Sequence, residues 1–428
     1  MMNRLIFGLA MTLALLTATL HAETTLIHAG QLLAVPGEAP QNEQTIVIVD
    51  GRITAVEGGY ADASAYPDAT VIDLKDQFVM PGLMDMHVHL QGELGPNQER
   101  DALKLSDELV HMRSIQYAMR TLRAGFTTVR DVGNDGQGMF ALRDAINRGY
   151  IDGPRIIAAG GVGITGGHAD ISGVKPDLME LYTARTICDG PFDCRRATRD
   201  AIKYGADLIK ITSTGGVLTD RATGTGQQME MDELREVVQA AQRMGRKVAS
   251  HAHAEEGIIA ALEAGVDSIE HGSYTGPRAI KLFKQTGAYL VPTLIAGETV
   301  KRMAENSDFM TPAIKEKAIR VGADMAGNFG KAYKAGVKIA YGTDSGVSAH
   351  GTNAEEAVLM YNAGMTPMDI LISATVNAAD LIDMTDQIGT IEVGKHADIV
   401  ATEVSPLEDI KALLEMGFVM KDGKVYLD

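Results

Sequence analysis

The chain has 428 residues, 45% of them hydrophobic, which is enough to bury one large core and a small accessory domain. Acidic residues outnumber basic ones by 56 to 39, so the formal net charge is −17. A surface of this sign repels nucleic acid and anionic membranes, and we expect neither as a partner.

The first 22 residues have the pattern of a secretory signal peptide. Arg4 is the only charged residue before position 23, an apolar run spans 5–16, and small residues end the segment at Ala22. A membrane anchor is the alternative, but the run is short for a span that needs about 20 apolar residues. We predict cleavage after Ala22 and an exported protein, periplasmic or secreted. Its charge would be −18, because 38 basic residues then face 56 acidic ones.

Residues 23–79 and 388–428 are predicted to form a small β-sandwich-like domain from the two ends of the chain. An Asp-Gly pair at 50–51 and another at 422–423 each join two runs rich in β-branched residues. Asp-Gly in this setting is a strong hairpin signal. We expect the two ends to pair beside a larger domain at 80–387.

From about residue 100 to 345 one rhythm repeats: a helix-like stretch, a glycine, and a short β-branched run. Glycine adopts the left-handed conformation after a helix at little cost, so each glycine marks a helix end. Seven such ends and an opening strand at 83–89 make eight βα units, which is typical of a (β/α)₈ barrel. A doubly wound open sheet would show the same alternation. The glycines are Gly125, Gly149, Gly205, Gly245, Gly265, Gly287 and Gly336, and three further strands are expected at 126–131, 155–159 and 289–293.

Five of the strand-like runs end in a group that could bind a metal ion. His87 and His89 share one side of the first strand, because residues i and i+2 of a strand do so. A lone His-x-His is more often two polar residues at a strand end, but here four other strand-like runs also end in a group that could bind a metal ion. The other runs end at Lys210, His251, His271 and Asp344. Groups from five strands converge on one point only in a closed ring, which favours the barrel.

Four further histidines are less informative. His168 follows two glycines in the loop after the third barrel strand, and His253 lies two residues after His251. Substrate contact is our interpretation for both, with an exposed loop residue the alternative for His168 and a metal ligand or a packed polar residue for His253. The isolated His111 and His350 are expected at the surface.

The two cysteines, Cys188 and Cys194, lie six positions apart with Gly and Pro between them. In an oxidising compartment this pair could close a disulfide across one loop. Two free thiols remain the alternative. Metal binding is less favoured, because no histidine or further cysteine lies nearby.

Taken together, eight segments resemble the metal-dependent amidohydrolase superfamily, and within it an exported dipeptidase-like group related to Xaa-Pro dipeptidase, imidazolonepropionase and ochratoxin-hydrolysing amidases. The resemblance runs from the N-terminal β-segment to the end of the chain. The segments are residues 81–89, 124–131, 165–168, 205–211, 250–253, 269–272, 342–344 and 394–399.

The resemblance implies two zinc ions bridged by N6-carboxylysine at Lys210. By this likeness His87, His89 and Asp344 bind the first ion, while His251 and His271 bind the second. Zinc lowers the pKa of bound water from 15.7 to about 7. Asp344 would be a ligand and also the general acid/base that passes a proton to the leaving amine.

These features predict an enzyme that hydrolyses the amide bond of dipeptides or N-acyl amino acids with a free C-terminal carboxylate. Alternatives are an ochratoxin-type N-acyl aromatic amino acid amidase and a lactone or cyclic amide hydrolase. A non-catalytic exported binding protein is more remote, because such a protein would be expected to lack a ligand. Loops 91–100, 162–195 and 213–228 should line the pocket. The resemblance also implies a homo-oligomer, which can be large.

Overall fold

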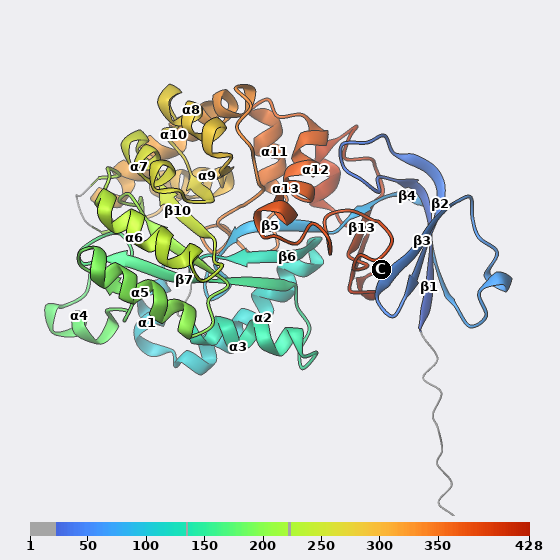
Figure 1. Ribbon diagram of the computed structural model, residues 1–428, viewed down its shortest axis with the longest axis horizontal. Coiled ribbons are helices and arrows are strands. Elements are labelled where there is room, and N and C mark those ends of the chain that lie inside the picture. Colours follow the sequence, from blue (N-terminus) through green and yellow to red (C-terminus); the bar gives the residue numbers. More distant parts are fainter. Residues whose placement is uncertain (1–22, 134–135, 221–223) are drawn as a thin grey trace, which may run out of the picture.

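The protein, described by a computed structural model over residues 23–133, 136–220 and 224–428, contains two β-sheets. One sheet curves into a barrel ringed by helices, and the other stands to one side of it (Figure 1). The predicted signal peptide at 1–22 lies outside the described residues. In the described part, no helix is both long and apolar enough to cross a membrane.

Seven strands follow one another around the barrel, and all pair in parallel. A two-residue strand, β8, pairs with the far end of β7. The barrel strands are β5 (Leu83–Val88), β6 (Phe126–Asp131), β7 (Arg155–Ile164), β9 (Leu208–Thr212), β10 (Val248–Ala252), β11 (Ser268–His271) and β12 (Tyr289–Val291), and β8 is Ile187–Cys188.

The eighth position of the barrel is taken by residues 338–345. Leu290 pairs with Ile339, and Val88 pairs with Ser345, each through a single parallel bridge. The amide of Asp344 donates to the carbonyl of His87 at 2.7 Å. The predicted (β/α)₈ barrel is therefore confirmed, although its last run closes the ring through isolated bridges and not as a regular strand.

Thirteen α-helices are found in the described part of the chain. The seven glycines predicted to end helices all have positive φ, as Gly265 does after α7 with φ 97°. The helices are α1 (Gln98–Lys104), α2 (Asp107–Arg123), α3 (Gln137–Asn147), α4 (Pro176–Tyr182), α5 (Pro191–Lys203), α6 (Met231–Gln242), α7 (Glu255–Ala264), α8 (Pro277–Thr286), α9 (Leu294–Asn306), α10 (Pro312–Lys334), α11 (Glu355–Asn362), α12 (Pro367–Ser373) and α13 (Val376–Leu381).

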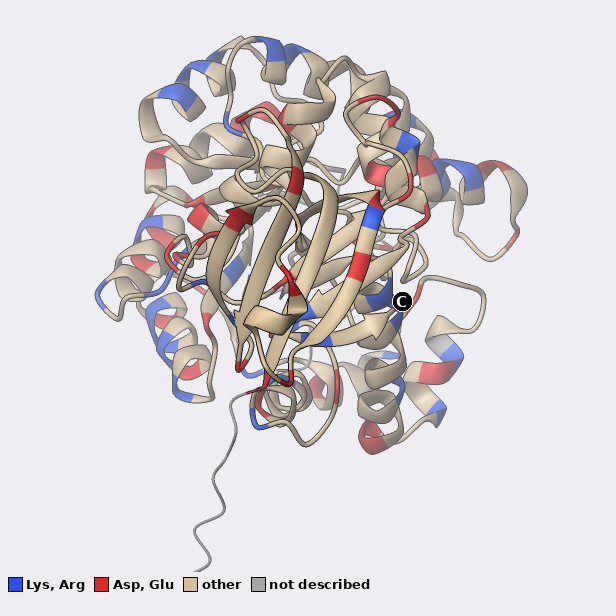
Figure 2. Ribbon diagram, turned by 90° about the vertical axis from the view of Figure 1, so that its right-hand side faces the viewer, with Lys and Arg blue, Asp and Glu red and all other residues tan. Residues whose placement is uncertain are grey.

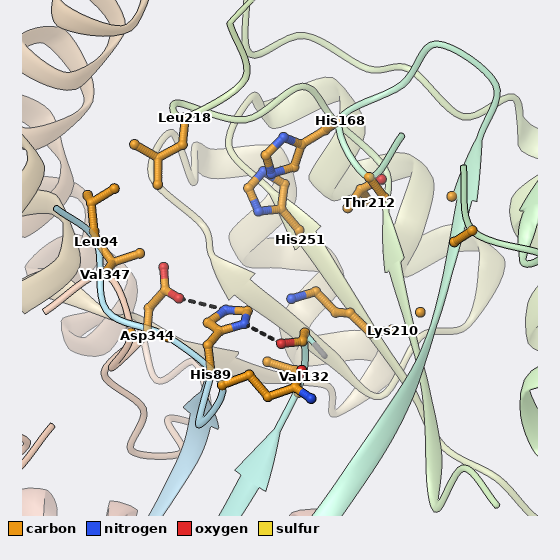
Figure 3. Close-up of a pocket in the computed structure, with 18 of the residues that line it drawn as sticks. His89, Leu94, Val132, His168, Lys210, Thr212, Leu218, His251, Asp344 and Val347 are labelled. Carbon is orange, nitrogen blue, oxygen red and sulfur yellow. Dashed lines mark hydrogen bonds and ion pairs between the residues drawn. The ribbon is translucent and has the colours of Figure 1, made fainter. Parts of the chain in front are cut away.

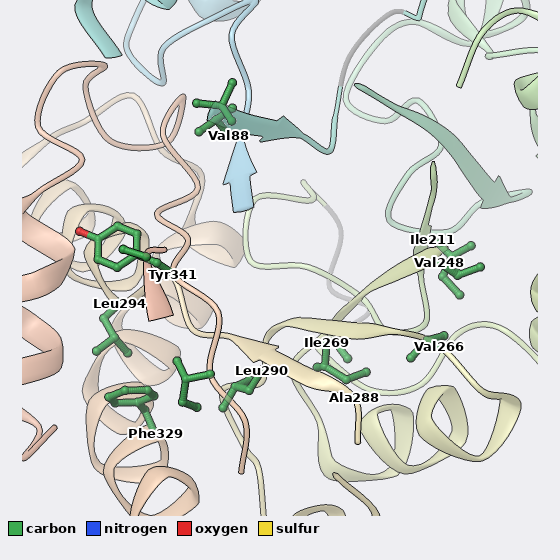
Figure 4. Packing of buried hydrophobic residues seen from close by; sticks show 14 of the residues in the cluster. Val88, Ile211, Val248, Val266, Ile269, Ala288, Leu290, Leu294, Phe329 and Tyr341 are labelled. Carbon is green, nitrogen blue, oxygen red and sulfur yellow. The ribbon is translucent and has the colours of Figure 1, made fainter. Parts of the chain in front are cut away.

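The main hydrophobic core lies between the barrel strands and the surrounding helices. Apolar side chains of the strands meet those of the helices there, as Leu290 of β12 meets Leu294 and Phe329 (Figure 4). Burial of this kind stabilises the fold by roughly 25 cal/mol per Å² of apolar surface. A rigid barrel can therefore hold polar groups at the ends of its strands.

The second sheet combines segments from both ends of the chain, as predicted. Its central pairing joins β4 to β13 in antiparallel fashion, and both Asp-Gly pairs form the expected hairpins. Asp50 and Gly51 have φ of 48° and 76°, the positive values that a tight hairpin turn needs. The order is β15-β14-β13-β4-β1-β2-β3, with β1 (Thr24–Leu32), β2 (Gln41–Val49), β3 (Arg52–Gly58), β4 (Thr70–Pro81), β13 (Ile399–Thr402), β14 (Phe418–Lys421) and β15 (Lys424–Leu427).

Charges are distributed unevenly over the molecule. Seen from the side of the second sheet, most of its strand surface is free of charged residues (Figure 2). Charges of both signs are mixed on the helices and loops around it. The net negative charge is therefore not gathered on this sheet.

Cys188 and Cys194 form a disulfide. It joins β8 to the first turn of α5 and closes the short loop between the two cysteines. The disulfide that the sequence favoured for this pair is therefore confirmed. Both cysteines are buried.

Candidate active site

The metal-competent groups meet at the carboxyl ends of the barrel strands. His87, Lys210, His251, His271 and Asp344 are all buried, and His89 is partly buried. All six line a cavity of about 1440 Å³. The carboxyl ends of parallel barrel strands are where (β/α)₈ enzymes carry their active sites.

His87, His89 and Asp344 form one tight cluster. The Nε2 atom of His89 lies 2.8 Å from Oδ1 of Asp344, and Nε2 of His87 lies 3.4 Å from the same oxygen (Figure 3). One ligand atom from each residue lies within 4.8 Å of the other two. Two imidazoles and a carboxylate at this spacing are a donor set that suits a divalent ion such as Zn²⁺.

A second group of imidazoles lies across the cavity floor. The ring centroid of His251 is 4.6 Å from that of His271 and 4.6 Å from that of His253. His271 in turn lies 5.0 Å from His87, which joins the two groups. Burial, followed by neighbouring charges, lowers the pKa of His251 and His271 well below the usual value. Both rings are therefore neutral and able to donate a lone pair to a metal ion.

Lys210 points its amine into the space between His89 and His251 (Figure 3). Burial lowers the pKa of this amine. Among the described residues, Lys210 Nζ has no hydrogen-bond acceptor and no carboxylate within ion-pair distance. Gly161 is its partner in the β7–β9 register, and a methyl group added at Gly161 would meet no atom within 4 Å. The amine is thus buried, unpartnered and next to open space.

Hydrogen bonds to Nδ1 fix the orientation of the rings. Nδ1 of His87 donates to Glu270 at 2.8 Å, and Nδ1 of His89 donates to the carbonyl of Gly133 at 2.9 Å. Nδ1 of His271 lies 2.8 Å from the hydroxyl of Thr293. In each case Nε2 is left for a ligand. A partner on the other nitrogen is the usual way in which proteins set the tautomer of a metal-binding histidine.

Glu270 and Arg130 belong to this site, although the sequence analysis did not single them out. Arg130 is fully buried and donates to Glu270 at 2.8 Å and to the hydroxyl of Ser268 at 3.1 Å. Burial opposes ionisation of Glu270, but Arg130 and His87 hold the pKa of its carboxyl well below the usual value. The sequence feature that could have identified this pair is a charged residue inside each of two apolar strand-like runs.

Three residues at the cavity floor have a strained backbone conformation. His271, Thr293 and Asp344 have φ of 69°, 52° and 59°, in the left-handed region that residues with a side chain seldom adopt. Such conformations cost of order 1–3 kcal/mol each and gather at functional sites. At Asp344 the conformation carries the chain past the end of the barrel and aims the carboxylate at His87 and His89.

The structure brings His168 and His253 to the same cavity. The ring of His168 lies 4.4 Å from that of His251, and its Nδ1 contacts the hydroxyl of Thr219. His253 is buried, with Nδ1 2.8 Å from the hydroxyl of Ser273. Both residues line the cavity, where a substrate could reach them.

The surface prediction for His350 is wrong. His350 is buried, stacks on Tyr117 with ring centroids 4.6 Å apart, and its Nε2 donates to the carbonyl of Gly92 at 3.0 Å. It fastens the loop after Asp344 to the loop after β5. His111 is half-buried against the start of α3, close to Gly138.

All three predicted loops contribute to the cavity wall. Leu94 comes from the first loop, His168 and residues 183–187 come from the second, and Leu218 comes from the third. Leu94, Leu218 and Val347 form an apolar wall beyond Asp344 (Figure 3). The cavity therefore combines a polar floor with partly apolar sides.

Comparison with known proteins identifies the family to which this architecture belongs. Residues 78–426 match the Amidohydrolase family over most of the chain. The chain belongs to the amidohydrolase family.

This amidohydrolase is similar to several characterised or solved relatives. A crystal structure of a Xaa-Pro dipeptidase with bound methionine in the active site is 42% identical with a TM-score of 0.91, covering 95% of this chain and all of that one. Ochratoxinase of Aspergillus niger is 31% identical over 96% of this chain and 88% of its own length. Imidazolonepropionase of Pyrobaculum arsenaticum is 26% identical over 85% of this chain and 86% of its own. The predicted superfamily and relatives are confirmed.

Family and geometry agree on the class of chemistry. The amidohydrolase is a hydrolase that acts on C–N bonds, and dependence on a metal ion is general in the family. The His-His-Asp cluster fits that dependence.

Proposed function

We propose that this amidohydrolase uses two zinc ions to cleave the amide bond on the amino side of an amino acid with a free carboxylate. Dipeptides and N-acyl amino acids are the substrates of this kind. The observation that carries the proposal is the position of Lys210, whose buried amine points between two separate groups of histidines. Five imidazole and carboxylate donors with one lysine between them exceed what a single tetrahedral ion takes up.

In this proposal His87, His89 and Asp344 hold the first ion, and His251 and His271 hold the second. When bound, the ions would lower the pKa of water and polarise the scissile carbonyl. Asp344 would accept the proton that water loses and deliver it to the nitrogen of the departing amine. His168 and His253 would contact the substrate from the cavity wall.

Lys210 would bridge the two ions as a carbamate. The lone pair of a neutral amine attacks the carbon of CO₂, an N–C bond forms as one C=O π bond breaks and its electron pair moves to oxygen, and the nitrogen loses a proton to water. The product carries a negative charge over two oxygens. The lowered pKa of Lys210 and the open space beside Gly161 support this reaction, because the first favours the neutral amine and the second leaves room for the added group.

The relatives narrow the class of substrate. The similar Xaa-Pro dipeptidase structure contains methionine, a free amino acid, in its active site. Ochratoxinase points to a bulkier N-acyl aromatic amino acid of the ochratoxin type as the second candidate, and the large cavity with its apolar wall would accommodate it. We also propose export to the periplasm or the outside of the cell, and assembly into a homo-oligomer.

Metal analysis together with a substrate screen tests the proposal. We expect about two equivalents of zinc per active chain, and loss of activity when a chelator removes them. Xaa-Met and Xaa-Pro dipeptides and N-acyl phenylalanine should be hydrolysed. Their C-terminal amides should react about ten- to a hundred-fold more slowly, because a charge-assisted contact is lost. One equivalent in fully active enzyme, or equal rates on acids and amides, would contradict the proposal.

Substitution of Lys210 tests the carbamate. Lys210→Ala should lose zinc and activity together, since the bridge between the ions is gone. Added short carboxylic acids should restore a fraction of both by occupying the vacated space. A fully metallated and active Lys210→Ala enzyme without such additives would show that the lysine is not a ligand.

A further inference from the structure

A lysine of α10 holds the loop that follows β9. Nζ of Lys317 donates to the carbonyl of Thr219 at 2.7 Å and to the carbonyl of Gly216 at 3.0 Å. The side chain is buried, with 4% of its surface exposed. A buried amine that donates to two carbonyls of one loop restricts that loop, because moving the loop would break both hydrogen bonds.

The position of Lys317 on its helix explains how it reaches this loop. Lys317, Val321 and Met325 lie at i, i+4 and i+8, so they share one face of α10. All three are buried, and Val321 and Met325 line the cavity. The face of α10 that helps to form the cavity therefore also carries Lys317, whose amine points to the loop at the edge of the same cavity.

The loop at 213–219 in turn sets the position of His168. The hydroxyl of Thr219 contacts Nδ1 of His168, which leaves Nε2 as the nitrogen that can meet a substrate. Gly216 lies against the same ring, and a methyl group added there would come within 2.1 Å of it. Both residues whose carbonyls accept from Lys317 therefore touch His168.

The same loop also reaches the proposed second metal position. Nε2 of His251 lies 3.4 Å from the carbonyl of Gly215, and the ring of His168 lies 4.4 Å from that of His251. The backbone amide of His168 donates to the side chain of Gln228 at 2.8 Å, which fixes the other side of the residue. The side chain of His168 is thus held by the loop, and the loop is held by Lys317.

We propose that Lys317 is a positioning residue for substrate binding, which acts by clamping the 213–219 loop so that His168 faces the cavity. The inference rests on the proposed role of His168 as a substrate contact. Lys317 itself does not line the cavity. Its effect on the reaction should therefore pass through His168.

A double-mutant cycle tests this chain of contacts. Lys317→Met keeps an unbranched side chain only one heavy atom shorter and removes its donors. We expect KM for the fastest substrate of the screen above to rise about ten-fold, the cost of one misplaced hydrogen bond, with kcat changed by less than about three-fold. In a His168→Ala background, Lys317→Met should change KM by less than about two-fold, since the residue it positions is absent. Zinc content should equal that of the wild type.

Hydrogen exchange provides a readout that does not depend on activity. Amides of residues 213–219 should exchange faster in Lys317→Met than in the wild type, and Lys317→Gln, which retains a shorter donor, should lie between them. Lys331→Met is the matched control, because Lys331 is an exposed lysine of the same helix that contacts Asn328 and not the loop. Lys331→Met should leave both the exchange of 213–219 and KM unchanged.

The outcomes separate this inference from the proposed function. Unchanged exchange of 213–219 in Lys317→Met overturns the clamp. Faster exchange with an equal rise of KM in both backgrounds overturns the route through His168. If His168→Ala alone has normal KM, His168 is not a substrate contact and the positioning role of Lys317 fails with it. If none of the amides is hydrolysed, the proposed function fails, and loop exchange still decides whether Lys317 holds the loop.

Discussion

Glu270 lies beneath the site without exposure to solvent, between the guanidinium of Arg130 and the ring of His87. Its carboxylate accepts from Nδ1 of His87 and so directs Nε2 of that ring toward Asp344. A neutral amide at this position would weaken the hydrogen bond that orients the ring of His87, and it would leave Arg130 buried without its counter-charge. The positions of two charged residues in the barrel interior thus bear directly on the metal cluster.

Glu270→Gln should therefore lower the affinity for the metal held by His87 by about 10–100-fold, as is usual when a hydrogen-bond partner of a ligand is removed. Competition with a chromophoric chelator measures this affinity. Ser268→Ala is the control, because it removes a hydroxyl that contacts the same carboxylate and leaves the contact with His87 in place. An affinity within about two-fold of the wild type in Glu270→Gln would rule out this role.

At the scale of elements, the disulfide between Cys188 and Cys194 fastens β8 to α5 beside the cavity. Residues 183–187, which lead into β8, line the cavity wall. Replacing both cysteines by serine should lower the free energy of unfolding by about 2 kcal/mol, the chain-entropy value for so short a loop. Urea unfolding measures the change. Wild-type protein kept in a reducing agent should behave like the variant, and equal stability of all three samples would show that the bridge contributes nothing.

At the scale of the whole molecule, Arg155 joins the barrel to the sheet formed by the chain ends. It donates to Asp398 at 2.6 Å and to Asp422 at 2.7 Å, and it is itself largely buried. Burial opposes ionisation of Asp422, but His396, Arg155 and Lys421 hold the pKa of its carboxyl below the usual value. A depressed folded-state pKa adds stability above the unfolded pKa, and this contribution is lost as the pH falls.

Arg155→Met should cost about 3–5 kcal/mol of unfolding free energy at neutral pH, because it leaves the buried carboxylate of Asp398 without its cationic partner. The difference from the wild type should shrink on acidification. Lys424→Met provides the comparison, since the Lys424–Asp152 pair links the same two regions at an exposed position and should contribute at most about 1 kcal/mol. Urea unfolding at several pH values checks both, and equal losses in the two variants would contradict the assignment.

The amino-acid sequence by itself determined the barrel, the hairpins and the candidate ligands, because these follow from local regularities. Glycines such as Gly265 end helices through their own backbone freedom, and Asp50-Gly51 turns through its own dihedral preferences. His87 and His89 share a face because a strand has a period of two. Such features depend on residues that are neighbours in the chain.

Only the tertiary structure decided which distant groups meet. His350 is buried, although its neighbours in sequence suggest a surface loop, because the folded chain places Tyr117 against its ring. Glu270 contacts Arg130, and Lys317 contacts Thr219. In each pair the two residues are more than 90 positions apart along the chain. No local sequence pattern indicates these contacts. They arise because closing the barrel brings remote strand ends and loops together, and a buried charge must find its partner among whatever the fold places beside it.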